Sequence, residues 1–264
     1  MRSIVIEPGF AAWRRAARGL VMEGVEPRAV EWREAEDAQA SLGLAMEAQA
    51  PDDVPPSAAF RVSRRFVELA EAAACHAHPE RWALLYRLLW RQTHGEPGLM
   101  EVATDPDVHR LLRMEKAVRR EVHRMHAFVR FRTVEHDGGA HYVAWFEPEH
   151  HVVERSAPFF AERFASMRWS ILTPRLCAHW DGQALAFTSG VPRSQAPDGD
   201  RLEALWRTYY ASTFNPARLR PAAMRTGMPR RYWKSLPEAD LIPALVHDAP
   251  ARVRQMLEEG RESA

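Results

Sequence analysis

Four polar side chains that suit acid–base chemistry lie within one stretch of the chain that predicts a long helix. Glu115 and Arg119 are four residues apart and can pair across one helical turn, with His126 on the same stripe and His123 beside it. They form a candidate catalytic site in which His123 or His126 moves a proton and Glu115 orients the imidazole. Arg119 or Arg130 would hold a phosphate there. An ion pair at the edge of a buried stripe explains Glu115 and Arg119 without any catalytic role.

A second stripe of the same predicted helix is basic. It consists of His109, Arg113, Lys116, Arg120 and His123. Side chains of this kind contact nucleic-acid phosphates, although a solvated helix face has the same pattern. His123 and His126 could share a metal ion, but no third ligand is evident nearby, so we expect neither a metal nor another cofactor.

The clearest indication of a nucleic-acid partner lies between Arg201 and Lys234, where Glu203 is the only acidic residue. Aromatic residues alternate there with cations, and such a mixture can stack on unpaired bases while holding the backbone. The alternative is that the aromatic rings form a core and the cations are solvated. Over the whole chain, the candidate nucleic-acid-binding residues are Lys116, Arg120, Arg130, Arg163, Tyr209, Asn215, Arg218, Arg220, Arg231, Tyr232, Trp233 and Lys234.

The overall charge hides this segregation. The chain has 36 Lys and Arg against 35 Asp and Glu, a formal net charge of +1. An acid-rich stretch over residues 23–53 offsets the basic stretch over residues 201–234, so a near-neutral total leaves room for a localised basic face. No Walker loop, dinucleotide-binding glycine pattern or HExxH motif occurs.

Composition places the chain among ordinary globular proteins, since 46% of its 264 residues are hydrophobic and 27% are charged. No apolar run is long enough to span a bilayer, and the first residues do not resemble a secretory signal. We therefore expect a cytoplasmic protein in which Cys75 and Cys177 are reduced thiols.

Periodicity and turn residues predict helices over residues 10–22, 63–74, 80–93, 105–125, 156–164 and 200–214, with shorter helical pieces over 216–224, 229–235 and 250–259. Strands are expected over residues 3–7, 25–32, 128–134, 141–146, 169–173, 178–181 and 184–187. The prediction is an α+β fold, a small antiparallel sheet packed with several helices in a single large domain. Along the chain we expect a strand–helix–strand segment over residues 1–50, a linker over 49–57, a main domain over 58–246 and a C-terminal tail over 247–264.

Several strings resemble those of a bacterial domain of unknown function associated with DNA repair or DNA metabolism. They are FAAWRRAARGL, VEPRAVEW, DPDVHRLLRMEKAVRREVHRMHAFVRFR, YVAWFEPEHHVV, APFFAERFASMRWSIL, LWRTYYASTFNPARL and MPRRYWKSLPEADLI. The resemblance reaches to about Val246. In relatives, the domain precedes a uracil-DNA glycosylase domain of the UdgX type or is encoded beside a radical-SAM protein of DNA repair or modification. The glycosylase motifs are absent here, so uracil excision is not implied.

Three functions remain open at this point. The resemblance and the basic aromatic half favour a protein that binds DNA, single-stranded or damaged, and works with a glycosylase or radical-SAM partner. An enzyme acting on a modified base or on the DNA backbone is the first alternative, with the Glu/Arg/His group as its site. The second is a protein-interaction scaffold that contacts a basic partner through the acidic stretch.

Overall fold

The structure is a computed structural model that describes residues 1–35, 60–136, 139–196, 211, 214–220, 224, 227–236 and 238–262. These ranges leave out the expected linker over residues 49–57, most of the helix expected over 200–214, and Asp137–Gly138 between two expected strands. The described helices are α1 (Phe10–Met22), α3 (Arg64–Ala74), α4 (Arg81–Thr93), α5 (Pro106–Phe128), α6 (Val153–Arg163) and α9 (Ile242–Glu262). The strands are β1 (Arg2–Ile6), β2 (Val30–Glu34), β3 (Arg132–His136), β4 (Gly139–Trp145), β5 (Trp169–Leu172), β6 (Leu176–Trp180) and β7 (Leu185–Ser189).

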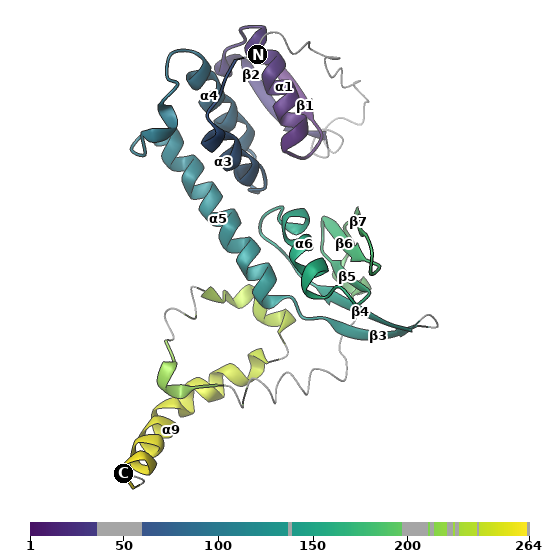
Figure 1. Cartoon of the computed structure of the whole chain (residues 1–264), viewed down its shortest axis with the longest axis vertical. Coiled ribbons are helices and arrows are strands. Elements are labelled where there is room, and N and C mark those ends of the chain that lie inside the picture. The colour runs from purple at the N-terminus through teal and green to yellow at the C-terminus, as the bar shows by residue number, and fades with distance from the viewer. Residues whose placement is uncertain are drawn as a thin grey trace. The chain divides into compact units, whose positions relative to one another are not determined.

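The chain folds into two compact units (Figure 1). The first comprises Met1–Glu121 with Glu149–His151, and the second comprises Val122–Pro148 with Val152–Ala264. Helix α5 runs from the first unit into the second. The mixture of helices and sheets confirms the predicted α+β class. No helix in the described ranges combines the length and apolar character needed to cross a membrane.

In the first unit, β1 and β2 form a parallel pair joined through α1, and α3 and α4 belong to the same unit. Helix α1 has the predicted bounds, and its apolar stripe places Trp13, Ala17 and Leu20 in the core. The Trp13 ring stacks on Trp82 of α4 with 6.2 Å between centroids. These contacts explain why helical periodicity predicts α1 at its observed bounds. The strand expected over residues 25–32 is shifted, because a 3-10 turn occupies Pro27–Ala29 and β2 begins at Val30.

A buried ion pair links β2 to α4 inside this core. The guanidinium of Arg81 bonds the carboxylate of Glu34, with 3% and 8% of the two side chains exposed. Arg81 also donates to the carbonyl oxygens of Ala74 and His78, and the indole N–H of Trp82 donates to Glu34 at 3.1 Å. Each charge is thus compensated within the core, which a buried charge requires.

Glu34→Ala is expected to lower the free energy of unfolding by about 3–5 kcal/mol, because it leaves the buried Arg81 charge without its partner. Urea denaturation measures the change. Glu31→Ala, which breaks the exposed pair with Arg33, is the matched control and is expected to cost less than about 1 kcal/mol. Equal effects of the two substitutions would contradict a special role for the buried pair.

Three histidines meet where the chain leaves α3. The His76 and His150 rings lie 4.2 Å apart between centroids, and His150 Nδ1 accepts from the backbone N–H of Ala77. His76 Nδ1 likewise accepts from the backbone N–H of His78. Burial, followed by His150, His78 and Arg81, lowers the pKa of His76 from 6.5 to about 4, against an opposing effect of Glu149.

This low pKa predicts a pH-dependent stability. Between pH 6.5 and 4 the unfolded chain binds a proton at His76 that the folded chain does not, so the free energy of unfolding falls as the pH falls through this window. His76→Gln removes the contribution and is expected to flatten the profile measured by urea denaturation across the window. His109→Gln, an exposed substitution on α5, is the control. A profile that His76→Gln leaves unchanged would contradict the assignment.

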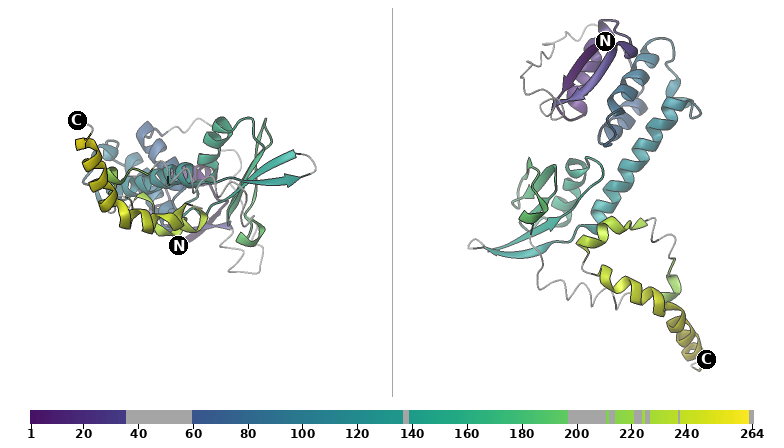
Figure 2. Two further views of the ribbon diagram at one scale, coloured as in Figure 1. Left: turned by 90° about the horizontal axis from the view of Figure 1, so that it is seen from below. Right: turned by 180° about the vertical axis from the view of Figure 1, so that it is seen from behind.

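The second unit is built on a five-stranded sheet of order β3-β4-β5-β6-β7. Helix α6 lies beside this sheet (Figure 2), where Phe160 packs its ring edge-on against Trp169 at 6.1 Å. Trp169, Ile171 and Ala178 are fully buried on this covered face. Since side chains alternate along a strand, Ser170 and His179 belong to the opposite face.

Two expectations about this sheet are corrected. The sheet is mixed rather than antiparallel, because α6 connects β4 to β5 and the two strands pair in parallel. The strand expected over residues 128–134 begins at Arg132, since α5 continues to Phe128 and the N–H of Val129 still donates to Met125. Phe128 and Arg130 therefore do not share a strand face with Arg132.

Candidate functional site

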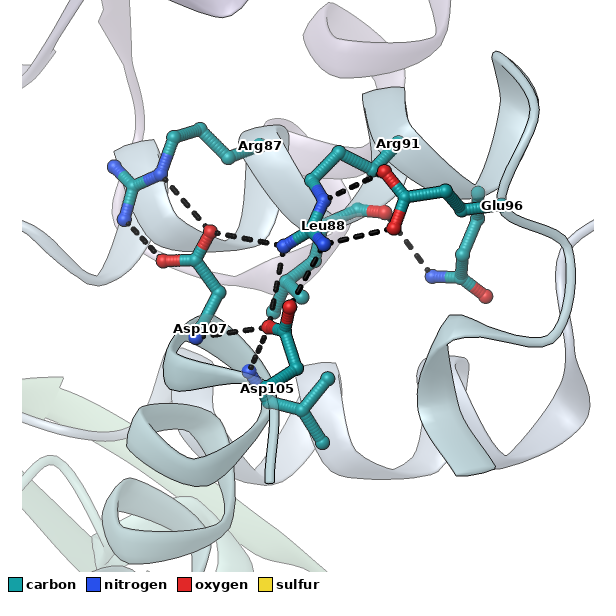
Figure 3. Close-up of polar contacts among 8 residues, drawn as sticks. Arg87, Leu88, Arg91, Glu96, Asp105 and Asp107 are labelled. Atoms are coloured by element: carbon teal, nitrogen blue, oxygen red, sulfur yellow. Dashed lines mark hydrogen bonds and ion pairs between the residues drawn. The ribbon is translucent and has the colours of Figure 1, made fainter. Parts of the chain in front are cut away.

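A capping network determines where α5 begins (Figure 3). The carboxylate of Asp105 accepts the backbone N–H groups of Asp107 and Val108 at 3.0 and 3.1 Å, as the side chain of an N-cap residue does. Arg91 of α4 bonds Asp105 and Glu96, each at 2.7 Å. The bond from Arg91 holds the pKa of Asp105 below its usual value, so the cap stays ionised.

The basic stripe that the sequence predicts is exposed along α5. Its five residues, defined above, all lie on the surface. Within the described part of the chain, no acidic side chain forms an ion pair with Arg113, Lys116 or Arg120. Arg119, which precedes Arg120 in the sequence but lies outside the stripe, pairs with Glu115. The stripe thus presents positive charge directly to solvent.

The four candidate catalytic residues do not gather at one point. Arg119 Nε lies 3.3 Å from a Glu115 carboxylate oxygen, but 73% of the Arg119 side chain is exposed and 26% of Glu115. Exposed pairs at this spacing contribute little to stability. His123 is exposed, whereas the His126 ring stacks on Phe159 of α6 with 4.0 Å between centroids. Burial lowers the pKa of His126, so its imidazole is neutral at pH 7.

The C-terminal candidates are divided between core and surface. Arg130 bonds Glu238 at 2.8 Å in a mostly buried pair. Tyr232 is 3% exposed, and its ring stacks on Phe146 at 5.1 Å with an interplanar angle of 3°. Trp233 is partly buried, and its indole N–H donates to the carbonyl oxygen of Met228 at 3.2 Å. The Tyr232 ring is therefore occupied by the protein itself, whereas Trp233 is only partly covered.

The remaining candidates that the structure describes are on the surface. Arg163 ends α6, and Arg220 and Arg231 are also exposed. The Arg231 guanidinium lies 4.8 Å from the centre of the Tyr232 ring. Asn215 is exposed and caps a short 3-10 turn, Pro216–Arg218, by accepting the backbone N–H of Ala217. Tyr209 and the side chains of Arg218 and Lys234 lie outside the described residues.

A polar row that the sequence analysis missed crosses the second unit's sheet on the face opposite α6. His141 Nε2 lies 2.9 Å from Ser170 Oγ, which lies 2.8 Å from His179 Nδ1. His179 Nε2 is in turn 2.9 Å from Thr188 Oγ1. The row comprises His141, Ser170, His179 and Thr188, one residue from each of four adjacent strands.

One assignment of donors and acceptors satisfies every group of the polar row. Thr188 Oγ1 donates at 3.5 Å to the carbonyl oxygen of Ser189, which can only accept. In this assignment Thr188 accepts from Nε2–H of His179, and the lone pair of His179 Nδ1 accepts from the Ser170 hydroxyl. Ser170 accepts from Nε2–H of His141. Burial lowers the pKa of His179, which favours the neutral ring that this assignment needs.

Polar residues in the predicted strands were the signal available for His141, Ser170 and His179, whereas Thr188 lies one residue beyond the strand expected over 184–187. His141, His179 and Thr188 each sit in a short strand, yet nothing in the sequence pairs β4 with β5 across an intervening helix. Elsewhere, no three His, Cys, Asp or Glu side chains of the described ranges are grouped so that they could hold a metal ion.

The fold and these surfaces define an α+β protein with an exposed basic helix and a polar sheet face. The chain belongs to the DUF4130 family, a domain of unknown function, whose sequence model matches residues 79–238. The match includes α5 and the whole five-stranded sheet. No curated protein and no solved structure matches the chain.

The placement of Tyr232 leads to a prediction about its role. Tyr232→Ala removes a buried, stacked ring and is expected to destabilise the fold by about 3–5 kcal/mol. Tyr232→Phe keeps the ring, loses the hydrogen bond from Arg231 and is expected to cost about 1 kcal/mol. Urea denaturation of both variants provides the measurement. Unchanged stability in Tyr232→Ala would show that the ring is not part of the core.

Proposed function

We propose that this chain is a DNA-binding protein of DNA repair and that the basic stripe of α5 is its contact with the phosphate backbone. The observation that carries the proposal is the exposure of Arg113, Lys116 and Arg120 on one side of a single helix. Within the described residues, no carboxylate pairs with them. Cations left available in this way release counterions from DNA when they bind its phosphates.

The dimensions of the stripe suit a nucleic-acid backbone. From His109 to His123 the helix rises about 21 Å at 1.5 Å per residue. Duplex DNA carries one negative charge per about 1.7 Å of axis, so several phosphates lie within this length. Contacts of this kind position a protein on DNA without reading its sequence. The proposal therefore concerns binding to DNA in general rather than to one base sequence.

Exposed cations of the second unit offer phosphate contacts on that unit's own surface. Arg163, Arg220 and Arg231 are on its surface and supply further phosphate contacts. Because the Tyr232 ring is buried, we assign the binding in this region to the cations rather than to stacking by Tyr232. The family resemblance supports a second protein that acts together with this one on the bound DNA. That protein would be a uracil-DNA glycosylase domain or a radical-SAM protein.

A salt titration of binding to a fluorescent DNA duplex tests this proposal. Each phosphate contact contributes about 0.9 to the slope of log Kd against log salt concentration. The triple variant Arg113→Ala, Lys116→Ala, Arg120→Ala is expected to reduce this slope by about 2–3 and to weaken binding at low salt. Fluorescence polarisation measures both quantities.

The matched control removes the same charge from another helix. Arg14, Arg15 and Arg18 lie on α1 outside the proposed interface, and their triple alanine variant is expected to keep the slope of the unsubstituted protein. Equal losses in the two triple variants would show a general charge effect and contradict the role of α5. Absence of binding by the unsubstituted protein at low salt would overturn DNA binding itself.

A further inference from the structure

The polar row contains the elements of a nucleophilic hydroxyl. Ser170 Oγ is held between two imidazoles, 2.8 Å from His179 Nδ1 and 2.9 Å from His141 Nε2. A serine hydroxyl becomes a useful nucleophile when an adjacent base accepts its proton as it attacks. In the assignment given above, His179 has the free lone pair that accepts this proton, and His141 has the N–H that can donate one.

The third member of such an arrangement orients the base. Thr188 Oγ1 accepts Nε2–H of His179 at 2.9 Å and thereby selects the tautomer with an unprotonated Nδ1. This is the role that a carboxylate has in the serine–histidine–aspartate triad, here performed by a neutral hydroxyl. Ser170 is 7% exposed, so its hydroxyl is held in the row, while His141 and His179 are half-buried and Thr188 is exposed.

The same face of the sheet also presents a cation. Arg132 of β3 is paired with Val143 of β4, which is paired with Ser170 of β5. Paired residues lie on the same side of a sheet, so Arg132 and Ser170 share a face two strands apart. An arginine on the same face as the nucleophile suits an anionic substrate, and its guanidinium matches the geometry of a phosphate group.

We propose that Ser170 is a catalytic nucleophile for phosphodiester hydrolysis, with His179 as its base and His141 as the acid for the leaving group. The choice of a phosphodiester rests on the proposed DNA binding, whereas the nucleophile rests on the polar row alone. The inference adds a reaction and three catalytic residues that the binding function does not need.

The reaction balances with these groups alone. Ser170 Oγ bonds to phosphorus as its proton passes to His179 Nδ1, and the bond from phosphorus to the leaving oxygen breaks as that oxygen takes the Nε2 proton of His141. In this step His141 begins as the imidazolium and ends as the neutral imidazole. Water then attacks the phosphoserine and gives one proton to His141, while His179 returns its proton to Ser170 Oγ. The net result is a phosphomonoester and an alcohol from one diester and one water.

Labelling with diisopropyl fluorophosphate tests the nucleophile without requiring DNA. This small reagent phosphorylates activated serines, and the adduct is located by peptide mass spectrometry of the full chain. We expect one adduct, on Ser170, that Ser170→Ala abolishes. His179→Gln is expected to slow labelling by about 100-fold or more, the usual contribution of a general base.

Two variants separate chemistry from simple structural damage. Fluoride leaves without needing a proton, so His141→Gln is expected to slow labelling far less than His179→Gln. Ser189→Ala removes a neighbouring exposed hydroxyl on β7 and is expected to label like the unsubstituted protein. Circular dichroism establishes that each variant is folded. Equal slowing by the two histidine variants would mean that the row has a structural role only.

The outcomes also separate this inference from DNA binding. A folded protein that binds DNA but acquires no label on Ser170 in excess reagent overturns the nucleophile and leaves the proposed binding function intact. Label on Ser170 without DNA binding supports the nucleophile and overturns the choice of DNA as substrate. Turnover of bis(4-nitrophenyl) phosphate that Ser170→Ala abolishes would then establish the diester chemistry directly.

Discussion

The bonds that Arg91 makes to Asp105 and Glu96 are the constraint on which the exposed surface of α5 depends. They connect the end of α4 to the N-cap of α5 and so determine the residue at which this helix starts. Each residue of an α-helix turns about 100° from the last, so moving that start relative to α4 would rotate the basic stripe toward the core. Val108, Leu111 and Val118 would leave the core in the same movement. A charged cap thus sets both the packing and the electrostatics of the helix.

The near-neutral composition of the chain is compatible with a basic surface because many acidic side chains are engaged in local pairs. Asp107 pairs with Arg87, Glu80 with Arg110, and Glu101 with Arg65, all within the first unit. Each pair neutralises one cation where it lies and leaves the stripe of α5 unaffected. Net charge is a sum over the molecule, whereas counterion release depends on the phosphates that a particular surface meets. For that reason, the sequence total of +1 says little about DNA binding.

Sequence patterns predicted what is local and missed what is long-range. Helix α1, the Asp105 cap and the exposed stripe of α5 follow from periodicity and capping, which involve neighbouring residues. The strand expected from Phe128 was wrong at its start because the hydrogen bonds of α5 extend over apolar residues that also suit a strand. Glu238, which bonds Arg130, is 108 residues away in the chain, and no periodicity could reveal such a partner.

The polar row is the strongest case of a feature that only pairing reveals. Ser170 and His179 face each other because β5 and β6 pair in one register, and a shift of one residue would turn either side chain toward α6. At 7% exposure, Ser170 requires satisfied hydrogen bonds, and valine would fill the same strand position without that need. Hydrogen bonds between four strands fix the rotamers of several polar side chains, which costs conformational entropy. Apolar side chains at the same strand positions would need less exact placement. A catalytic role therefore explains these polar residues better than a contribution to stability does. The covered face formed by Trp169 and Ile171 already supplies the packing that this sheet needs.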